Sequence, residues 1–209
     1  MIYNLYKQLS SAYGEQNWWP LSGYMNKFDE VFIGAILTQN TSWKNVEKAL
    51  ENLINAKILS LRDILNTDNN VLKALIKPAG FYNLKAERLK EFAKAVSKVS
   101  KEEIDRDFLL SIKGVGKETA DTILLYGLDK LTFVVDAYTK RLFYRLKIIK
   151  YEKINYDELK TLIENNIPKN LELYKEYHAL IVKHCKNLCK KKPLCDKCFL
   201  KDWCYNKQN

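Results

Sequence analysis

The stretch from Leu110 to Arg141 constrains the fold more than any other part of the sequence. Two helical patterns in it flank a short lysine- and glycine-containing segment, and an aspartate, Asp136, follows further along. Glycines let the backbone turn tightly, and free amides at positions 115–117 would open the next helix. Such amides between two lysines can hold a phosphate, although an ordinary turn between two helices is the alternative. The segment consists of Lys113, Gly114, Val115, Gly116 and Lys117.

Composition favours a helical, globular protein with an anionic partner. The chain of 209 residues has seven glycines and four prolines, which leaves little room for the many turns of an all-β fold. The net charge of +10 and the pI near 9.2 favour nucleic acid over a membrane surface. We find no run of about eighteen apolar residues and no signal peptide, so the sequence predicts a cytoplasmic, nucleoid-associated protein that does not use a membrane.

A tryptophan pair and a proline, Trp18, Trp19 and Pro20, follow the first helical pattern. Their aromatic faces could wall a pocket for a flat ligand, because an aromatic ring stacks on any base. Packing of the tryptophans between two lobes is the alternative. A further tryptophan, Trp43, starts the third helical pattern.

Two loops carry side chains that could enter a DNA duplex. Gln39 and Asn40 lie at a junction between helices, where their amides could fill a gap in the duplex or simply cap a helix. Phe81 lies in a loop with Gly80 and nearby cations, where it could act as an intercalating wedge or tuck under its own loop.

Asp136 directly precedes a helical pattern, after a short extended run at 132–135. This N-cap position predicts a carboxylate with a lowered pKa that is ionised at neutral pH. In the last helical pattern, His178 and Cys185 share the buried stripe, which predicts interior positions for both. His184 lies off that stripe beside a lysine, and we expect it to be solvated or near a phosphate.

Four more cysteines lie close together near the end of the sequence. In a cytoplasmic protein, four thiolates at such short spacing predict a metal site rather than disulfides. One central C-x2-C with longer outer arms is typical of an iron–sulfur cluster, whereas zinc usually takes paired short knuckles and is the alternative. The expected ligands are Cys189, Cys195, Cys198 and Cys204, in a basic, lysine-rich loop.

Together these motifs resemble endonuclease III and the helix-hairpin-helix DNA glycosylase superfamily, over nearly the whole chain and in the right order. The resemblance implies an all-α molecule of two lobes: a six-helix lobe at 24–130, and a helical lobe made of 1–23 and 131–209 that ends in the [4Fe–4S] loop. Its implied partner is double-stranded DNA containing a damaged base, bound by a monomer.

The resemblance also implies roles for the residues singled out above. The hairpin at 113–117 would grip phosphates, Gln39 would fill the space left by a flipped nucleotide, and Phe81 would wedge the opposite strand. The flipped base would enter a pocket near the tryptophans, and Asp136 would stabilise the oxocarbenium-like charge or direct water.

Two departures refine the expected activity. Bifunctional endonuclease III has a nucleophilic lysine two residues beyond the second hairpin glycine, and Glu118 stands there in this sequence. The sequence therefore predicts a monofunctional glycosylase, with Lys117 as a phosphate contact. The tryptophan motifs look more like the bacterial 3-methyladenine glycosylase branch, whose aromatic pocket suits a cationic alkylated purine. The alternatives are a glycosylase for oxidised or mismatched bases and a non-catalytic damage-binding protein.

Overall fold

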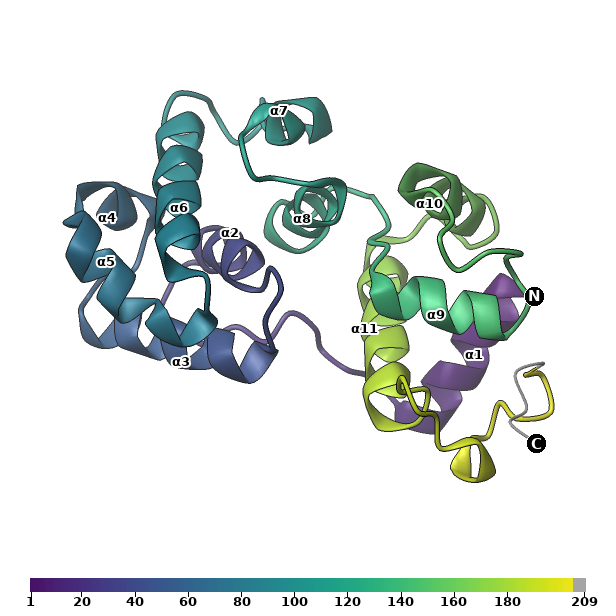
Figure 1. Ribbon diagram of the computed structural model, residues 1–209. Coiled ribbons are helices and arrows are strands. Elements are labelled where there is room, and N and C mark those ends of the chain that lie inside the picture. The colour runs from purple at the N-terminus through teal and green to yellow at the C-terminus, as the bar shows by residue number, and fades with distance from the viewer. Residues whose placement is uncertain (205–209) are drawn as a thin grey trace. The chain divides into compact units, whose positions relative to one another are not determined.

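The computed structural model describes residues 1–204, and every regular element in that part of the chain is a helix (Figure 1). The predicted all-α fold class is thereby confirmed. The described residues form two compact units: Trp19–Lys130, and Met1–Trp18 together with residues 131–204. Residues 19–23, expected in the second lobe, belong to the first of these units. No helix within residues 1–204 is long and apolar enough to cross a membrane.

The unit Trp19–Lys130 is built around α2, whose residues from Asp29 to Leu37 are all buried. Asn26 caps this helix by accepting a hydrogen bond from the Asp29 N–H, and α3, α6, α8 and η2 contact its sides. The elements of the unit are α2 (Lys27–Leu37), α3 (Trp43–Asn55), α4 (Leu61–Asn66), α5 (Asn69–Leu75), η1 (Lys77–Ala79), α6 (Tyr82–Val96), α7 (Arg106–Ser111), α8 (Lys117–Thr122) and the π-helical turn η2 (Ile123–Gly127).

The second unit is organised by α11, which contacts both α1 and α9 (Figure 1). The Tyr177 hydroxyl on α11 donates to the Ile2 carbonyl at 2.9 Å, and the Phe133 ring meets Tyr174 and Tyr177 edge to face. The helices of this unit are α1 (Ile2–Tyr13), α9 (Ala137–Arg145), α10 (Tyr156–Glu164), α11 (Leu171–Asn187) and the short η3 (Cys195–Lys197).

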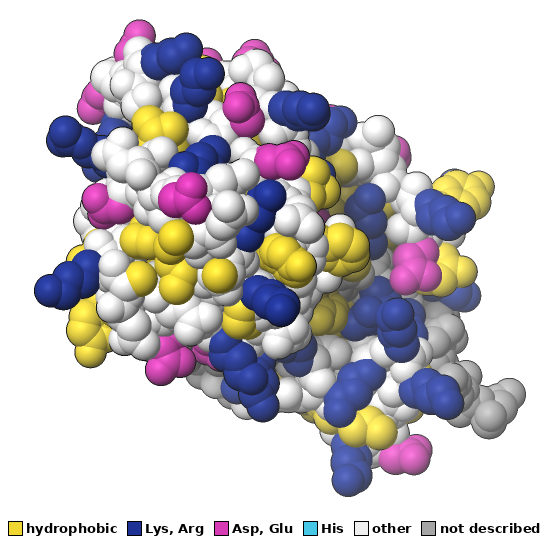
Figure 2. All heavy atoms as spheres, turned by 60° about the vertical axis from the view of Figure 1, so that its left-hand side comes forward, with side chains coloured by type: hydrophobic (Ala, Val, Ile, Leu, Met, Phe, Trp, Pro, Cys, Tyr) yellow, Lys and Arg dark blue, Asp and Glu magenta, His cyan; other side chains and the backbone are white. Residues whose placement is uncertain are grey.

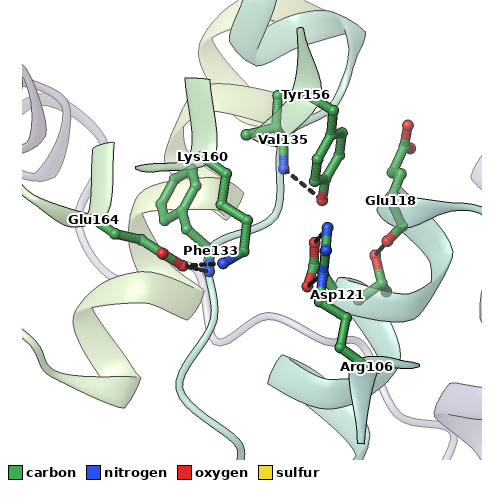
Figure 3. A network of polar contacts seen from close by, with 9 residues as sticks. Arg106, Glu118, Asp121, Phe133, Val135, Tyr156, Lys160 and Glu164 are labelled. Atoms are coloured by element: carbon green, nitrogen blue, oxygen red, sulfur yellow. Dashed lines mark hydrogen bonds and ion pairs between the residues drawn. The ribbon is translucent and has the colours of Figure 1, made fainter. Parts of the chain in front are cut away.

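The predicted extended run before α9 lacks a strand partner among the described residues; side chains of α10 hold it instead. The Phe133 N–H donates to the Glu164 carboxylate at 2.7 Å, and the Val135 N–H donates to the Tyr156 hydroxyl at 3.3 Å (Figure 3). Lys160 pairs with Glu164 at 2.8 Å. Backbone donors of an irregular segment are thus satisfied, and the segment delivers Asp136 to the start of α9.

Candidate functional site

The hairpin between α7 and α8 is held from two sides. Gly114 has φ +91, and a Cβ built there would lie 2.7 Å from Nε of Arg88, so the turn needs a glycine at this position. Across the hairpin, Arg106 on α7 forms two hydrogen bonds of 3.0 and 3.1 Å with the fully buried Asp121 carboxylate on α8 (Figure 3). This bidentate pair fixes the two helices against each other.

The two glycines of the hairpin differ in backbone conformation and in the space around them. Gly116 has φ −95 and ψ 174, an extended conformation open to any residue, and a Cβ there would meet nothing within 4 Å. The predicted need for a glycine in the turn thus applies to Gly114 only, and Gly116 leaves an open surface at the N-terminus of α8. Lys113 is exposed and Lys117 is half-buried, so both lysines flank this surface.

One predicted donor of the hairpin is already used inside the protein. The Val115 N–H donates to the Ile112 carbonyl at 3.0 Å, and the Val115 side chain is buried in the core. The expectation of a free amide at Val115 is therefore wrong, because the turn closes on itself through that hydrogen bond.

Gln39 faces the hairpin. Its Nε2 donates to the Gly114 carbonyl at 3.0 Å and to Oγ1 of Thr119 at 3.1 Å, while its Oε1 accepts from the Arg88 guanidinium. Arg88 therefore both packs on Gly114 and holds Gln39. The amide is preorganised against the hairpin rather than used as a helix cap, and Asn40 beside it is exposed with φ 52.

Phe81 projects into solvent. It is 65% exposed and occupies the left-handed region with φ 46, directly before α6. A bulky residue in this conformation is uncommon and strained. The alternative in which Phe81 tucks under its own loop is wrong for this structure.

The tryptophans separate between the two units. Trp19 meets Trp43 edge to face at 4.9 Å between ring centroids and Tyr126 at 5.6 Å, and a Cβ on Gly34 would lie 3.1 Å from its ring. Trp18 lies in the other unit, where Nζ of Lys186 is 5.8 Å from its ring centroid. Pro20 is exposed. The structure thus brings together Trp19 and Trp43 from the predicted set.

Asp136 is the N-cap of α9, with a side chain that is 11% exposed. Its Oδ1 accepts from the Thr139 N–H at 2.7 Å and from the Thr139 hydroxyl at 2.8 Å, whereas its Oδ2 lies 3.6 Å from Nε2 of His178 on α11. Burial raises the pKa of the Asp136 carboxyl, but the nearby His178 ring and the hydrogen bonds from Thr139 lower it by more. The net lowered pKa, expected for an N-cap carboxylate, leaves a partly accessible anion.

Two histidines of α11 have surroundings that the sequence patterns did not predict. His178 is buried as expected, but no pattern in the sequence placed it opposite Asp136. His184 is 1% exposed, so the expected solvated or phosphate-near position is wrong. Its Nδ1 is 3.0 Å from the Tyr13 hydroxyl and its Nε2 is 3.7 Å from Sγ of Cys198, and burial lowers its pKa to about 4. Cys185 is buried, as expected.

The four terminal cysteines line one hollow beside α9 and the end of α11. Arg145 donates to Sγ of Cys189 at 3.3 Å and to the carbonyls of Lys190 and Lys191, while Arg141 donates to the Cys189 carbonyl at 2.9 Å. A hydrogen bond from Cys185 lowers the pKa of Cys189 to about 6, which favours the thiolate that a metal requires. The cysteines around the hollow are Cys189, Cys195, Cys198 and Cys204.

This donor set fits a metal group chemically, since four soft sulfurs share one hollow and cationic side chains surround it. Within residues 1–204, no three His, Cys, Asp or Glu side chains converge as a preformed site for a metal ion.

Positive charge is widespread on the surface. Figure 2 shows Lys and Arg side chains over the whole of one face, with fewer acidic side chains between them. The net charge of +10 and this spread of cations are in keeping with a polyanionic partner.

Comparison with known proteins gives consistent matches. A family model described as "HhH-GPD superfamily base excision DNA repair protein" matches residues 33–169. The protein named "Putative DNA repair glycosylase MJ1434" of Methanocaldococcus jannaschii is 56% identical over 218 residues, which cover 99% of this chain and 97% of that protein. Endonuclease III of Sulfolobus acidocaldarius is 32% identical over 216 residues, covering 96% of this chain and 93% of that protein.

A solved structure is also similar. The 3-methyladenine DNA glycosylase of H. pylori, bound to 1,N6-ethenoadenine, matches with a TM-score of 0.76 and 34% identity, covering 88% of this chain and 97% of that chain.

Proposed function

The chain belongs to the HhH-GPD superfamily of base excision DNA repair proteins, and we propose that it is a monofunctional DNA glycosylase that flips a damaged base out of a duplex and releases it. The observation that carries this proposal is Asp136, a largely buried carboxylate with a lowered pKa that lies between Thr139 and His178. Thr139 holds one oxygen, so the other is directed and can face a developing positive charge.

In the proposed reaction the bond between the sugar and the base breaks with oxocarbenium character, and the Asp136 carboxylate stabilises that charge. The departing base takes the bonding electrons. A water molecule then attacks the sugar carbon and gives a proton to the Asp136 carboxylate, and an abasic site remains. His178 acts as a positioning residue, because its Nε2 lies beside the carboxylate oxygen that Thr139 does not hold.

We expect the hairpin and the two loops to contact DNA. The open surface at Gly116, flanked by Lys113 and Lys117, suits a phosphate. Phosphate contacts of this kind do not depend on the base sequence. The exposed Phe81 suits a wedge between bases, and Gln39 with Asn40 would occupy the space that the flipped nucleotide leaves.

Lyase activity is not expected of this chain. Glu118 occupies the position of the nucleophilic lysine, and its carboxylate is exposed and points away from the Arg106–Asp121 pair (Figure 3). A carboxylate cannot form a Schiff base with the sugar. Borohydride should therefore trap no covalent enzyme–DNA adduct, and a trapped adduct that disappears on mutation of a lysine would contradict this part of the proposal.

For the substrate, we propose an alkylated purine such as 3-methyladenine. The support is the cluster of Trp19, Trp43 and Tyr126, because electron-rich rings attract a cationic base by stacking and cation–π interaction. The similarity to the H. pylori enzyme is in keeping with this substrate. Endonuclease III of S. acidocaldarius is a relative of comparable identity, and a glycosylase for oxidised or mismatched bases is the second candidate.

A panel of duplexes, each with one lesion, tests the substrate directly. We expect alkali-labile sites in duplexes with 3-methyladenine or ethenoadenine, and none with an oxidised pyrimidine or a mismatch. The opposite pattern supports the second candidate. Asp136→Asn tests the third, a non-catalytic binding protein: base release should be lost while binding to a damaged duplex is kept.

We also propose that Cys189, Cys195, Cys198 and Cys204 hold a [4Fe–4S] cluster, as relatives of the endonuclease III type usually do, with zinc as the alternative. The cluster would fold the basic terminal loop and present its lysines to DNA. Iron, sulfide and zinc analysis with visible absorbance distinguishes the two metals. We expect the protein to act in the cytoplasm and as a monomer. Light scattering with and without a duplex would check the monomeric state.

A further inference from the structure

Lys85 on α6 is a charged residue in the interior that the proposed reaction does not use. It is 1% exposed, and its ammonium donates to the Leu37 carbonyl at 2.7 Å and to the Ala79 carbonyl at 2.8 Å. Burial, with the nearby charge of Arg88, lowers the pKa of Lys85 to about 8. A buried ammonium is costly unless its hydrogen bonds are made, so these two contacts decide what the residue does.

Each of the two carbonyls that Lys85 contacts belongs to the last residue of a helical element. Leu37 is the last residue of α2 and Ala79 is the last residue of η1. Two residues beyond each lies a side chain assigned to the interior of the DNA duplex, Gln39 in one loop and Phe81 in the other. Both loops then pass through the left-handed region, at Asn40 with φ 52 and at Phe81 with φ 46.

We propose that Lys85 is a positioning residue that sets the spacing between the two loops that enter the duplex. One ammonium bonded to both carbonyls keeps the starts of these loops within two hydrogen-bond lengths of each other. Gln39 and Phe81 can then approach opposite strands as one preorganised element rather than two independent ones. This inference rests on the DNA contacts of Gln39 and Phe81 under the proposed function.

The neighbouring side chain on α6 extends the same arrangement. Arg88, one turn beyond Lys85, holds the Gln39 amide and packs against Gly114 of the hairpin. The buried end of α6 therefore contacts the beginnings of both loops and the hairpin. Lys85 supplies the fixed point between the loops, because it is the more buried of the two cations.

Lys85→Met tests the inference, since it keeps the length of the side chain and removes its donors. The matched control is Lys90→Met. Lys90 lies on the same helix and also donates to two carbonyls, those of Leu65 and Thr67, but these belong to the junction of α4 and α5, away from both loops. A general loss of stability would affect both variants, whereas a loss of loop spacing would affect only Lys85→Met.

The probe is a duplex with a tetrahydrofuran abasic analogue opposite 2-aminopurine, whose fluorescence rises when the base is unstacked. With the metal-loaded full chain, we expect Lys85→Met to slow this rise by roughly 10- to 100-fold, the cost of an ångström-scale misplacement. Its affinity for a duplex already opened by a bulge at the same site should stay that of the wild type. Lys90→Met should match the wild type on both probes.

The outcomes distinguish a failure of the Lys85 inference from a failure of the proposed DNA contacts. If Lys85→Met unstacks 2-aminopurine as fast as the wild type, or loses affinity equally for both duplexes, the inference is overturned. If Gln39→Ala and Phe81→Ala also leave the signal unchanged, the proposed DNA contacts themselves are wrong. Should Lys85→Met fail to fold, Lys85→Arg carries the test, because its longer, planar head alters the spacing and should produce the same selective loss.

Discussion

The two hairpin glycines predict opposite outcomes for the same substitution. Gly114→Ala would force an L-residue to φ +91 and place its Cβ 2.7–2.8 Å from three side-chain atoms of Arg88. The backbone term costs about 1–2 kcal/mol, and displacing the Arg88 guanidinium from Gln39 costs about 1–2 kcal/mol more. Lower entropy of the unfolded chain returns about 0.4–1 kcal/mol. We therefore expect a net loss of about 1–3.6 kcal/mol.

Gly116→Ala meets no atom within 4 Å and keeps an ordinary φ of −95. Its stability should be unchanged or higher by up to about 1 kcal/mol, for the same unfolded-state reason. The added methyl group would occupy the surface assigned to the phosphate, so its affinity for DNA should fall although its fold is intact.

Thermal unfolding followed by circular dichroism measures the first effect, with an expected fall of roughly 5–10 °C for Gly114→Ala and none for Gly116→Ala. Fluorescence anisotropy with a duplex containing an abasic analogue measures the second. Equal melting temperatures for Gly114→Ala and the wild type would refute the strain argument. Wild-type DNA affinity in Gly116→Ala would show that the open face of the hairpin is not a contact.

Three further predictions concern other positions. Since the folded-state pKa of Asp136 is lowered, its carboxylate contributes stability that is complete above about pH 4 and is lost as pH falls through the lowered pKa; acid melts of Asp136→Asn should lack that contribution. Glu118→Lys restores an amine at an exposed position of α8 and should yield an adduct trapped by borohydride, with stability within roughly 0.5 kcal/mol of the wild type in urea melts. Phe81→Gly should relieve left-handed strain of about 1 kcal/mol and leave urea stability equal or higher, while base release from an intact duplex slows; a large loss of stability would contradict the conformation described for Phe81.

Local patterns in the sequence predicted the start of α9 correctly. Asp136 caps α9 as expected, because the preference of an aspartate for this position depends only on the residues next to it. The Ser60 side chain likewise accepts from the Asp63 N–H at the start of α4. Such interactions span three residues and can be predicted from the sequence alone.

Contacts between distant segments were beyond the sequence patterns. The packing of Arg88 on Gly114 and the hydrogen bonds of Gln39 depend on how α6 meets the hairpin, which no periodicity specifies. The prediction of a solvated or phosphate-near position for His184 was wrong for a related reason. Its neighbour Lys183 is exposed, but α11 is covered on several faces, by α1, α9 and the loop of Cys198, so one buried stripe describes it poorly.

The pairing of α1 with α11 has a consequence for the order in which the chain folds during synthesis. Residues 1–18 leave the ribosome well before their partners in α11 are made. These partners include Glu176, which accepts from the N–H groups of Gln16 and Asn17. The unit Trp19–Lys130 draws its core from residues within itself and is complete in the meantime. We expect that unit to fold before the other during synthesis. Until α11 is made, the apolar side of α1 stays exposed to solvent, and a chaperone could bind it during this period.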